Sequence, residues 1–393
     1  MRILVITNLY PPHVLGGYEI LCSQVVERLR EHGHDVLVVT SDHGTGVHDA
    51  PAEGVSRSLR LYAPFTRRAG LERHRRLATD TWNARVTARA VRDFRPDRVF
   101  VWSQLRLTLG AARAAERSGV PVCYALNDEH LAGYVPVPSG PSPRSIVGSV
   151  VDRSLLRRLT ASTLELRHVT CISHRLRHNL VARGVPVSHA RVIYQGIPLA
   201  RFPRKAGAER RPGPFRVLYT GQLHADKGVH TLVEAVGRIA ARRGQDALSL
   251  TVVGAGARDY TAALERAAAT MPITFLGFQD HERLPAVYRD HDAFVFPSIW
   301  QEPFGLTFLE AMASGTPVVS TTGGGHGECL IDGDNALTFE AGNADALACC
   351  LERLMASPWL GHRLADAGRQ LVESHLNLDC YASGLEAFLE TAA

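Results

Sequence analysis

Two glutamates, Glu302 and Glu310, frame the segment of the chain best suited to binding a phosphorylated ligand. An apolar run ends at Pro297, and a helical pattern follows that stops at Gly315, a residue favoured in the left-handed cap of a helix. The free N–H groups at the start of such a helix bind anions such as phosphates. One carboxylate then precedes the phosphate site and the other lies one turn inside the helix, an arrangement suited to sugar hydroxyls on one side and a ribose diol on the other.

A pair of glycines, Gly16 and Gly17, follows the first apolar run of the chain. Glycines let the backbone approach a ligand closely and present N–H groups to a phosphate, although a two-glycine turn is often only a turn. A second glycine-bounded segment, Gly221–Gly228, contains Lys227, one of only two lysines in the sequence.

The elements that must position these residues alternate along the whole chain. Short β-branched runs are followed by stretches with helical spacing, such as 21–32 and 82–94, which favours parallel doubly wound α/β sheets. Ligands bind such sheets at the carboxyl ends of the strands, so two facing domains would form a cleft between those ends. Strands are expected at 3–7, 36–40, 99–102, 122–125, 169–172, 192–194, 217–220, 250–253, 273–276, 293–297 and 317–321.

The domain boundaries follow from composition. Residues 198–214 are rich in proline, glycine and charge without apolar periodicity, which is typical of a linker. We therefore expect an N-terminal, acceptor-side Rossmann-like domain at 1–197 and a C-terminal, nucleotide-sugar-binding one at 215–375. The remaining residues, 376–393, are expected to form a helix that crosses back to the N-terminal domain.

The composition is that of a globular protein with large cores, with 45% hydrophobic and 21% charged residues among 393. No apolar run reaches the roughly 18 residues of a membrane span, and the chain starts directly on a strand pattern, so a cytoplasmic location is expected. Seven cysteines without a C-x-x-C pair favour buried free thiols over disulfides or zinc ligands.

Charge differs between the two halves. Residues 1–196 hold 27 Lys and Arg against 16 Asp and Glu, a balance of +11, whereas residues 197–393 hold 17 against 23, a balance of −6. A basic half could attract an acidic acceptor, an anionic membrane or nucleic acid. The basic residues are scattered and form no nucleic-acid motif, which favours a solvated arginine-rich surface.

The spacing Glu302-x7-Glu310 resembles the E-x7-E signature of family-4 retaining glycosyltransferases, in particular bacterial hexosyltransferases of the glycosyl transferases group 1 type. The resemblance covers nearly the whole chain. It also includes the segments 8–12 with Gly16-Gly17, 192–197 with Phe202, 221–228, and 317–328. It implies a GT-B fold, in which two Rossmann-like doubly wound domains face each other across a cleft. It further implies a nucleotide-diphosphate sugar bound by the C-terminal domain, retention at the anomeric carbon, and no cofactor or obligatory metal.

By this resemblance, Lys227 neutralises the diphosphate as negative charge builds on the leaving group, and the Gly16-Gly17 loop closes over the β-phosphate. The catalytic residues it implies are Glu302, Lys227, Asn127 and Asp128, and the donor-binding residues are Gly16, Gly17, Gln222, Lys227, Phe304, Gly305, Leu306 and Glu310.

Two positions depart from the family pattern. Gln222 stands where the family usually has arginine, and Asn127-Asp128 where it commonly has His-Asp. An asparagine can donate to a sugar hydroxyl but does not titrate. His130 lies three residues on and is either a substitute or an ordinary loop histidine.

Three other patterns carry weaker hypotheses. Asp290-His291-Asp292 resembles a metal-binding D-x-D, but its place just before a strand favours a structural role. Val253-Gly254-Ala255-Gly256 lacks the third glycine of a dinucleotide fingerprint and predicts a tight turn beside the base. Residues 133–149 predict a long loop, either an acceptor-side element or a plain insertion.

The sequence thus predicts transfer of a hexose-type sugar from a UDP- or GDP-sugar to a small-molecule or lipid-linked acceptor. No nucleic-acid partner is expected, and membrane contact is not favoured. The rival interpretations are a sugar-nucleotide epimerase or hydrolase of the same fold, and a donor-binding protein with reduced catalysis.

Overall fold

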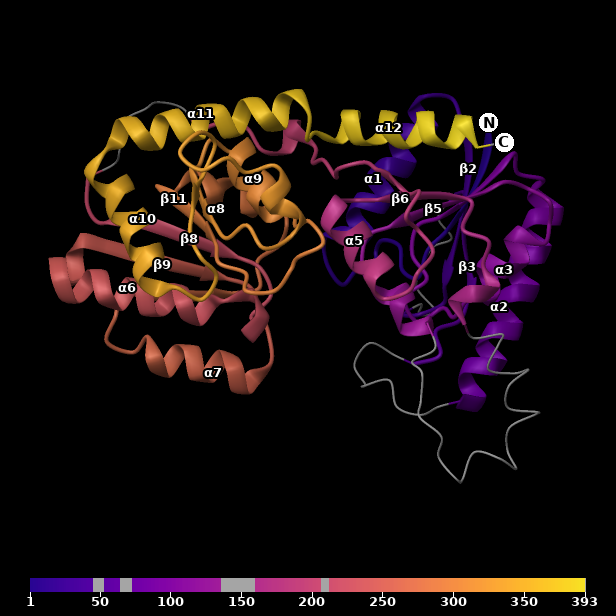
Figure 1. Ribbon diagram of the computed structural model, residues 1–393, viewed down its shortest axis with the longest axis horizontal. Helices are drawn as coiled ribbons and strands as arrows, with labels where there is room; N and C mark the ends of the chain where they lie inside the picture. Colours follow the sequence, from indigo (N-terminus) through magenta and orange to yellow (C-terminus); the bar gives the residue numbers. More distant parts are fainter. Residues whose placement is uncertain (45–52, 64–72, 136–159, 206–211, 393) are drawn as a thin grey trace. The chain divides into compact units, whose positions relative to one another are not determined.

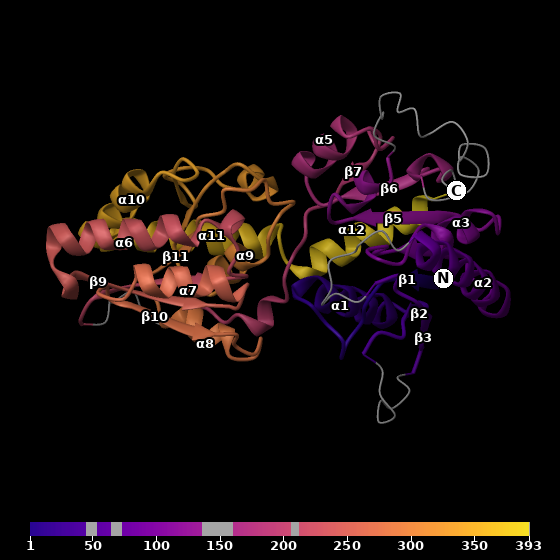
Figure 2. The same ribbon diagram turned by 90° about the horizontal axis from the view of Figure 1, so that it is seen from below.

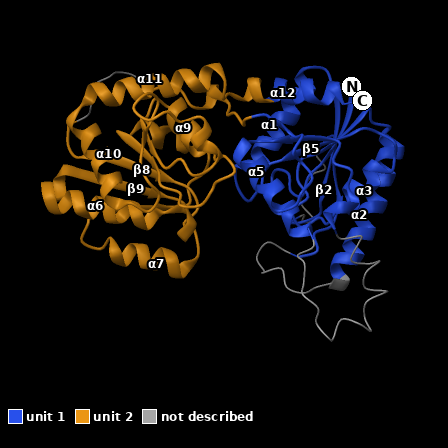
Figure 3. Ribbon diagram, viewed as in Figure 1, with its two compact units in different colours: residues 1–193, 382–393 blue, residues 194–381 orange. Residues whose placement is uncertain are grey.

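The computed structural model describes residues 1–44, 53–63, 73–135, 160–205 and 212–392. It divides the chain into two compact units, Met1–Ile193 with Ala382–Ala393, and Tyr194–Tyr381 (Figure 3). The first boundary therefore falls four residues before the predicted one at 197, and the described part of the predicted linker 198–214 belongs to the second unit.

The first unit contains a sheet of seven parallel strands, some of which are labelled in Figure 1. Their order is β3-β2-β1-β4-β5-β6-β7. Four consecutive residues of its first strand, Ile3–Ile6, are fully buried, because both faces of a parallel sheet are covered. The strands are β1 (Arg2–Ile6), β2 (Asp35–Ser41), β3 (Val55–Leu59), β4 (Arg98–Val101), β5 (Val122–Leu126), β6 (His168–Cys171) and β7 (Arg191–Val192).

The described helices of the first unit are α1 (Gly17–Glu31), α2 (Arg73–Phe94), α3 (Gly110–Glu116) and α5 (His174–Ala182), with short 3-10 turns η1 (His130–Tyr134) and η3 (Ala161–Thr163). Helices α2 and α3 pack side by side (Figures 1 and 2).

The C-terminal helix α12 (Leu378–Thr391) corresponds to the helix predicted at 376–393, and from Ala382 onward it belongs to the first unit. Its Glu386 carboxylate lies 2.7 Å from both His32 Nδ1 and His34 Nε2. Arg98 Nε donates to Leu389 O over 2.9 Å. These contacts attach the end of the chain to the unit in which the chain begins.

The second unit contains a sheet of six parallel strands in the order β10-β9-β8-β11-β12-β13. The strands are β8 (Phe215–Thr220), β9 (Leu248–Val253), β10 (Ile273–Gly277), β11 (Ala293–Phe296), β12 (Val318–Ser320) and β13 (Leu337–Thr338). The longer helices are α6 (Val229–Arg243), α7 (Arg258–Ala267), α8 (Leu284–Arg289), α9 (Thr307–Ala313), α10 (Ala344–Ala356) and α11 (Pro358–Ser374). The 3-10 turns are η4 (Leu199–Arg201), η5 (Ala225–Lys227), η6 (Gln245–Ala247) and η7 (Gly325–Glu328).

Both sheets are doubly wound, as predicted. In each of them the first strand in sequence, β1 or β8, lies between the second strand and a later one, so the winding reverses beside it. Ligands bind such sheets at the carboxyl ends of the strands that flank the reversal, here β1 with β4 and β8 with β11. Among the described helices, none is long and apolar enough to cross a membrane.

Candidate active site

The segments that follow β8 and β11 are joined at the carboxyl edge of the second sheet. Gly228 has a positive φ of 68°, and a Cβ there would lie 2.0 Å from Pro297 O, so only glycine permits this approach. The carbonyl oxygen of Asp226 accepts hydrogen bonds from Ile299 N at 2.9 Å and Trp300 N at 3.1 Å. The intervening residue, Lys227, is thereby fixed beside the end of β11.

The Lys227–Glu302 cluster consists of Lys227, Ser298 and Glu302. Lys227 Nζ donates to Glu302 Oε1, and Ser298 Oγ donates to the same oxygen over 3.0 Å. The Glu302 side chain is only 6% exposed, whereas that of Lys227 is 26% exposed. A carboxylate this buried needs a charged partner, which Lys227 supplies. Lys227 Nζ also lies 5.5 Å from the centre of the Trp300 ring.

The loop after β12 holds the backbone of Glu302. Gly325 N donates to Glu302 O over 2.7 Å, and a Cβ on Gly324 would lie 2.5 Å from the same oxygen. His326, next in the loop, is buried and its Nε2 lies 2.8 Å from Thr321 O. Burial lowers the pKa of His326 to about 4, so the ring is neutral at neutral pH. The backbone of this loop therefore holds Glu302 in place, and His326 adds no charge to the loop at neutral pH.

Glu310 lies in the first turn of α9, which begins at Thr307, just after the predicted start at Phe304–Leu306. Glu310 is 4% exposed. Its Oε2 accepts a hydrogen bond from Tyr288 OH over 2.7 Å, and its Oε1 lies 3.3 Å from His281 Nε2. Burial and the Glu310 charge raise the pKa of Tyr288 well above its ordinary value, so the phenol stays protonated and donates.

The other residues of this unit that are predicted to bind the nucleotide sugar differ in which of their groups are accessible to a ligand. The side chain of Phe304 is fully buried and stacks on Tyr194 with ring centres 5.6 Å apart, so only its backbone could face a ligand. Gly305 has a positive φ of 93°, and Leu306 is the N-cap of α9 without a side-chain cap bond. Gln222 is exposed, and its carbonyl accepts from a buried tyrosine, Tyr219.

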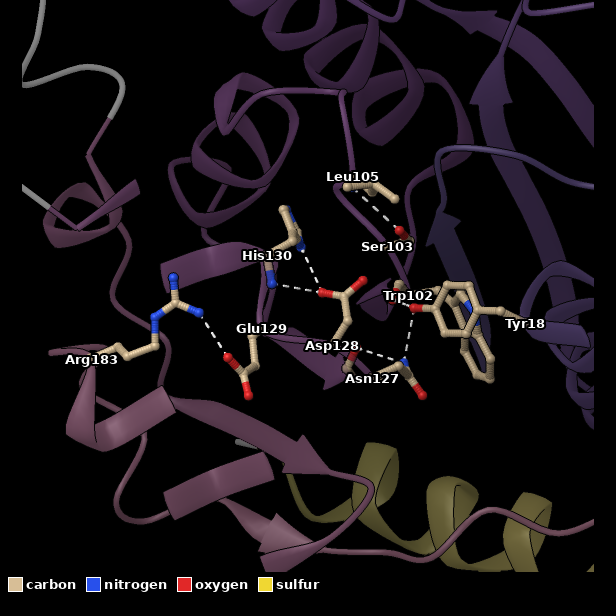
Figure 4. Close-up of polar contacts among 10 residues, drawn as sticks. Tyr18, Trp102, Ser103, Leu105, Asn127, Asp128, Glu129, His130 and Arg183 are labelled. Carbon is tan, nitrogen blue, oxygen red and sulfur yellow. Dashed lines mark hydrogen bonds and ion pairs between the residues drawn. The ribbon is translucent and has the colours of Figure 1, made fainter. Parts of the chain in front are cut away.

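In the first unit, Asn127 and Asp128 follow β5 (Figure 4). Asn127 Nδ2 donates to Tyr18 Oη over 2.9 Å, and Tyr18 OH donates to Trp102 O at the end of β4. Asp128 Oδ1 accepts from the backbone N of His130 at 2.9 Å and lies 3.1 Å from its Nδ1. Burial raises the pKa of the Asp128 carboxyl, but the charge and hydrogen bonds of His130 together lower it by a larger amount. The pKa of Asp128 therefore lies below its ordinary value. His130 thus orients Asp128 in the structure.

The glycine pair lies where the loop after β1 ends and α1 begins. Gly16 is the N-cap and Gly17 the first helical residue. Glu19 Oε2 accepts hydrogen bonds from Leu15 N at 3.2 Å and Gly16 N at 3.1 Å, and burial raises the pKa of Glu19. A phosphate can therefore take these N–H groups only if Glu19 releases them. Because glycine has no side chain to cap the helix, only the Glu19 half of a capping box is present here, with the carboxylate on the N–H of the N-cap residue.

Two residues of the D-x-D pattern, His291 and Asp292, form hydrogen bonds with other residues of the second unit. Asp292 Oδ2 accepts from Arg216 N over 2.8 Å, and His291 lies 2.6 Å from Val287 O and 2.8 Å from Thr251 Oγ1. Within the described ranges, no group of three or more histidine, cysteine or acidic side chains is arranged to hold a metal ion. Of the long loop predicted at 133–149, residues 136–149 lie outside the described part of the chain.

Comparison with known proteins identifies relatives over the whole chain. A family model described as Glycosyltransferase Family 4 matches residues 15–201, and one described as Glycosyl transferases group 1 matches residues 214–357. Glycogen synthase of Mycobacterium tuberculosis is 30% identical over 413 residues, covering 98% of this chain and 93% of the relative. D-inositol 3-phosphate glycosyltransferase of Rhodococcus erythropolis is 27% identical over a match that covers 65% of this chain and 59% of the relative.

Solved structures share the fold. Sucrose-phosphate synthase from Thermosynechococcus elongatus superposes with a TM-score of 0.74 at 22% identity, covering 99% of this chain and 98% of that one. HepE from Anabaena, solved in complex with UDP-glucose, superposes with a TM-score of 0.71 at 20% identity over 100% of both chains.

Proposed function

The chain belongs to the glycosyltransferases of family 4 and group 1 and has their GT-B fold, and from this premise we propose that it is a retaining hexosyltransferase. The donor would be a UDP- or GDP-sugar, and the acceptor a small molecule or a lipid-linked glycan. We further propose that the reaction needs neither a metal nor another cofactor.

The Lys227–Glu302 cluster is the observation that supports this proposal. It joins a cation and a carboxylate at the carboxyl ends of β8 and β11, beside the reversal of the sheet where such folds bind ligands. Lys227 is the more exposed partner and can therefore turn toward a diphosphate. Glu302, released from the lysine, would then accept hydrogen bonds from the donor-sugar hydroxyls.

In the proposed reaction the bond between the anomeric carbon and the diphosphate oxygen breaks, and its electron pair remains on the diphosphate. Lys227 stabilises that growing charge, an effect that acts on the transition state more than on the bound substrate. The acceptor hydroxyl adds on the face that the diphosphate leaves, which retains the anomeric configuration. Its proton goes to the departing diphosphate oxygen, which balances the transfer.

The relatives define the acceptor panel. Because a glycogen synthase is 30% identical, α-1,4-glucan oligosaccharides come first, followed by inositol phosphate and lipid-linked glycans. The assay measures release of UDP or GDP from each donor with and without each acceptor. We expect release to depend on one acceptor. Lys205→Ala, which removes the only other lysine of the chain, serves as the charge-matched control for Lys227→Ala.

The rival interpretations give different outcomes. An epimerase or hydrolase would convert or break down the donor without any acceptor. A donor-binding protein would bind the nucleotide and release nothing with any acceptor, and Gln222→Arg would restore no activity. Either result would replace the transferase proposal.

A further inference from the structure

Four side chains form what we name the Glu310 network: Thr220, Tyr288, Glu310 and His281. Thr220 Oγ1 lies 2.6 Å from Tyr288 Oη, which in turn donates to Glu310 Oε2 over 2.7 Å. A phenol has one proton, and Glu310 receives it, so Thr220 must donate to Tyr288. On the other side, His281 Nε2 lies 3.3 Å from Glu310 Oε1. Among the described residues, Oε2 therefore has one hydrogen-bond donor, Tyr288, and Oε1 has an ion-pair contact with His281.

Each oxygen of Glu310 keeps acceptor capacity that the described residues do not use. An ionised carboxylate has about four lone-pair sites; Tyr288 donates to Oε2, and His281 Nε2 lies at ion-pair distance from Oε1. Tyr288 and His281 thus contact opposite oxygens of the carboxylate, and no further side-chain donor to either oxygen comes from the part of the chain that the structure describes. A vicinal diol offers two hydroxyl donors at a matching separation.

Exposure indicates the side from which a ligand reaches these positions. Tyr288 is fully buried and Thr220 is 4% exposed, whereas the His281 side chain is 27% exposed. The Tyr288 side of the carboxylate is thus closed by the core, and the side next to His281 faces outward. Phe202, fully buried, lies edge-on to both rings, with centres 6.2 Å from His281 and 6.1 Å from Tyr288.

We propose that Tyr288, supported by Thr220, and His281 determine the preference for a ribonucleotide over a 2′-deoxyribonucleotide, by holding Glu310 in the orientation that accepts both ribose hydroxyls. This inference rests on the proposed function, in which the ligand of the second unit is a nucleoside diphosphate. Tyr288 and His281 are positioning residues, since they act through the Glu310 carboxylate.

The test measures dissociation constants of UDP and GDP, each beside its 2′-deoxy counterpart, by titration calorimetry on the whole chain. A hydroxyl bound to a fixed carboxylate should favour the ribonucleotide roughly tenfold or more. In Tyr288→Phe the carboxylate can rotate, and the ratio should fall below about threefold. Thr220→Val should lower the ratio less, because it removes only the support of Tyr288.

The two ends of the network have matched controls. Tyr124→Phe removes a buried tyrosine–carboxylate hydrogen bond of 2.8 Å, to Glu116 in the first unit, and should leave the ratio unchanged. His281→Ala should lower the ratio, whereas His281→Gln keeps a donor and should preserve it. A general loss of folding stability would not make the ribose preference of Tyr288→Phe differ from that of Tyr124→Phe, or that of His281→Ala from that of His281→Gln.

An unchanged ribose preference in Tyr288→Phe overturns the inference while leaving the proposed function intact. If Tyr288→Phe does not fold, an unchanged preference in Thr220→Val and in both His281 variants overturns it in the same way. Failure of the wild-type chain to bind either UDP or GDP overturns both, and is recognised because it precedes any substitution.

Discussion

Replacing Lys227 by alanine separates the two roles that we assign to this residue, which are neutralising the buried Glu302 carboxylate and stabilising the departing diphosphate. In the structure the Lys227 ammonium neutralises Glu302, whose side chain is 6% exposed. After the substitution Ser298 is the one described side chain that still donates to that carboxylate. Leaving a buried charge unpaired costs about 3–5 kcal/mol. Because the Lys227 side chain is a quarter exposed, water can enter the space it leaves and solvate part of the Glu302 charge. We therefore expect the unfolding free energy to fall by about 1–2 kcal/mol.

The catalytic loss should be larger than the loss of donor affinity. The charge of Lys227 matters most when the diphosphate departs, so turnover should fall about 100-fold or more, the range seen when one electrostatic donor is removed. The double variant Lys227→Ala/Glu302→Gln no longer buries an unpaired charge. It should therefore regain most of the lost stability and none of the turnover.

The measurements are urea unfolding and steady-state turnover on four proteins: wild type, the Lys227 variant, the double variant and Lys205→Ala. Lys205 Nζ donates to His291 O, and Lys205 is not one of the proposed donor-site residues, so its variant should retain turnover. Wild-type turnover in Lys227→Ala would refute the catalytic role. Equal stability of the single and double variants would refute the pairing argument.

Three further predictions concern neighbouring residues. Glu302→Ala should lower transfer while nucleoside diphosphate affinity stays nearly intact; a parallel fall in both would mean that Glu302 shapes the phosphate loop. Gln222→Arg should tighten nucleoside diphosphate binding in calorimetry, because it adds a second cation; unchanged affinity would count against Gln222 facing the diphosphate. Since burial lowers the pKa of His326 to about 4, its contribution to stability is complete above about pH 6.5 and is lost as pH falls toward 4. Wild type should lose about 1 kcal/mol between pH 6.5 and 5.5 from this group, and His326→Gln should show a flatter profile in chemical unfolding.

The strands that sequence reasoning found are those with continuous apolar runs. A strand such as β1, buried on both faces, reads as an uninterrupted run, Ile3–Ile6. Strand β3, Val55–Leu59, was missed because its three middle residues, Ser-Arg-Ser, are all polar and it is only partly buried. Strand β13 has two residues, too few to give a pattern.

In the candidate site, too, the sequence predicts some residues but not the contacts between them. The pairing of Lys227 with Glu302 depends on residues 75 positions apart, and no periodicity in the sequence links them. Ser298 and Thr220 stand at strand ends, where polar residues often face ligands, so their positions were a usable signal. Tyr288 and His281 reach Glu310 only through the packing of α8 and the loop before it, which sequence alone does not give.

The glycine segments also have contacts that their spacing does not reveal. Gly228 lies close to the Pro297 carbonyl oxygen, a contact between segments far apart in the sequence. Closure of Gly16 and Gly17 over a β-phosphate stays a prediction; in the structure the pair stands at the start of α1, where Glu19 accepts hydrogen bonds from the N–H groups of Leu15 and Gly16. The capping carboxylate is an ordinary local interaction that outweighs the flexibility of two glycines.

The configuration of the transferred sugar tests the central claim most directly. An α-linked nucleotide hexose with an equatorial 2-hydroxyl and the acceptor that supports nucleotide release are incubated with wild-type protein, and the product is followed by proton NMR from the first minutes. We predict that the new anomeric proton has the small coupling of an α-linkage, as in the donor, and that Lys227→Ala forms this product at least about 100-fold more slowly. A β-linked product, or donor consumption with no glycoside formed, would contradict the account.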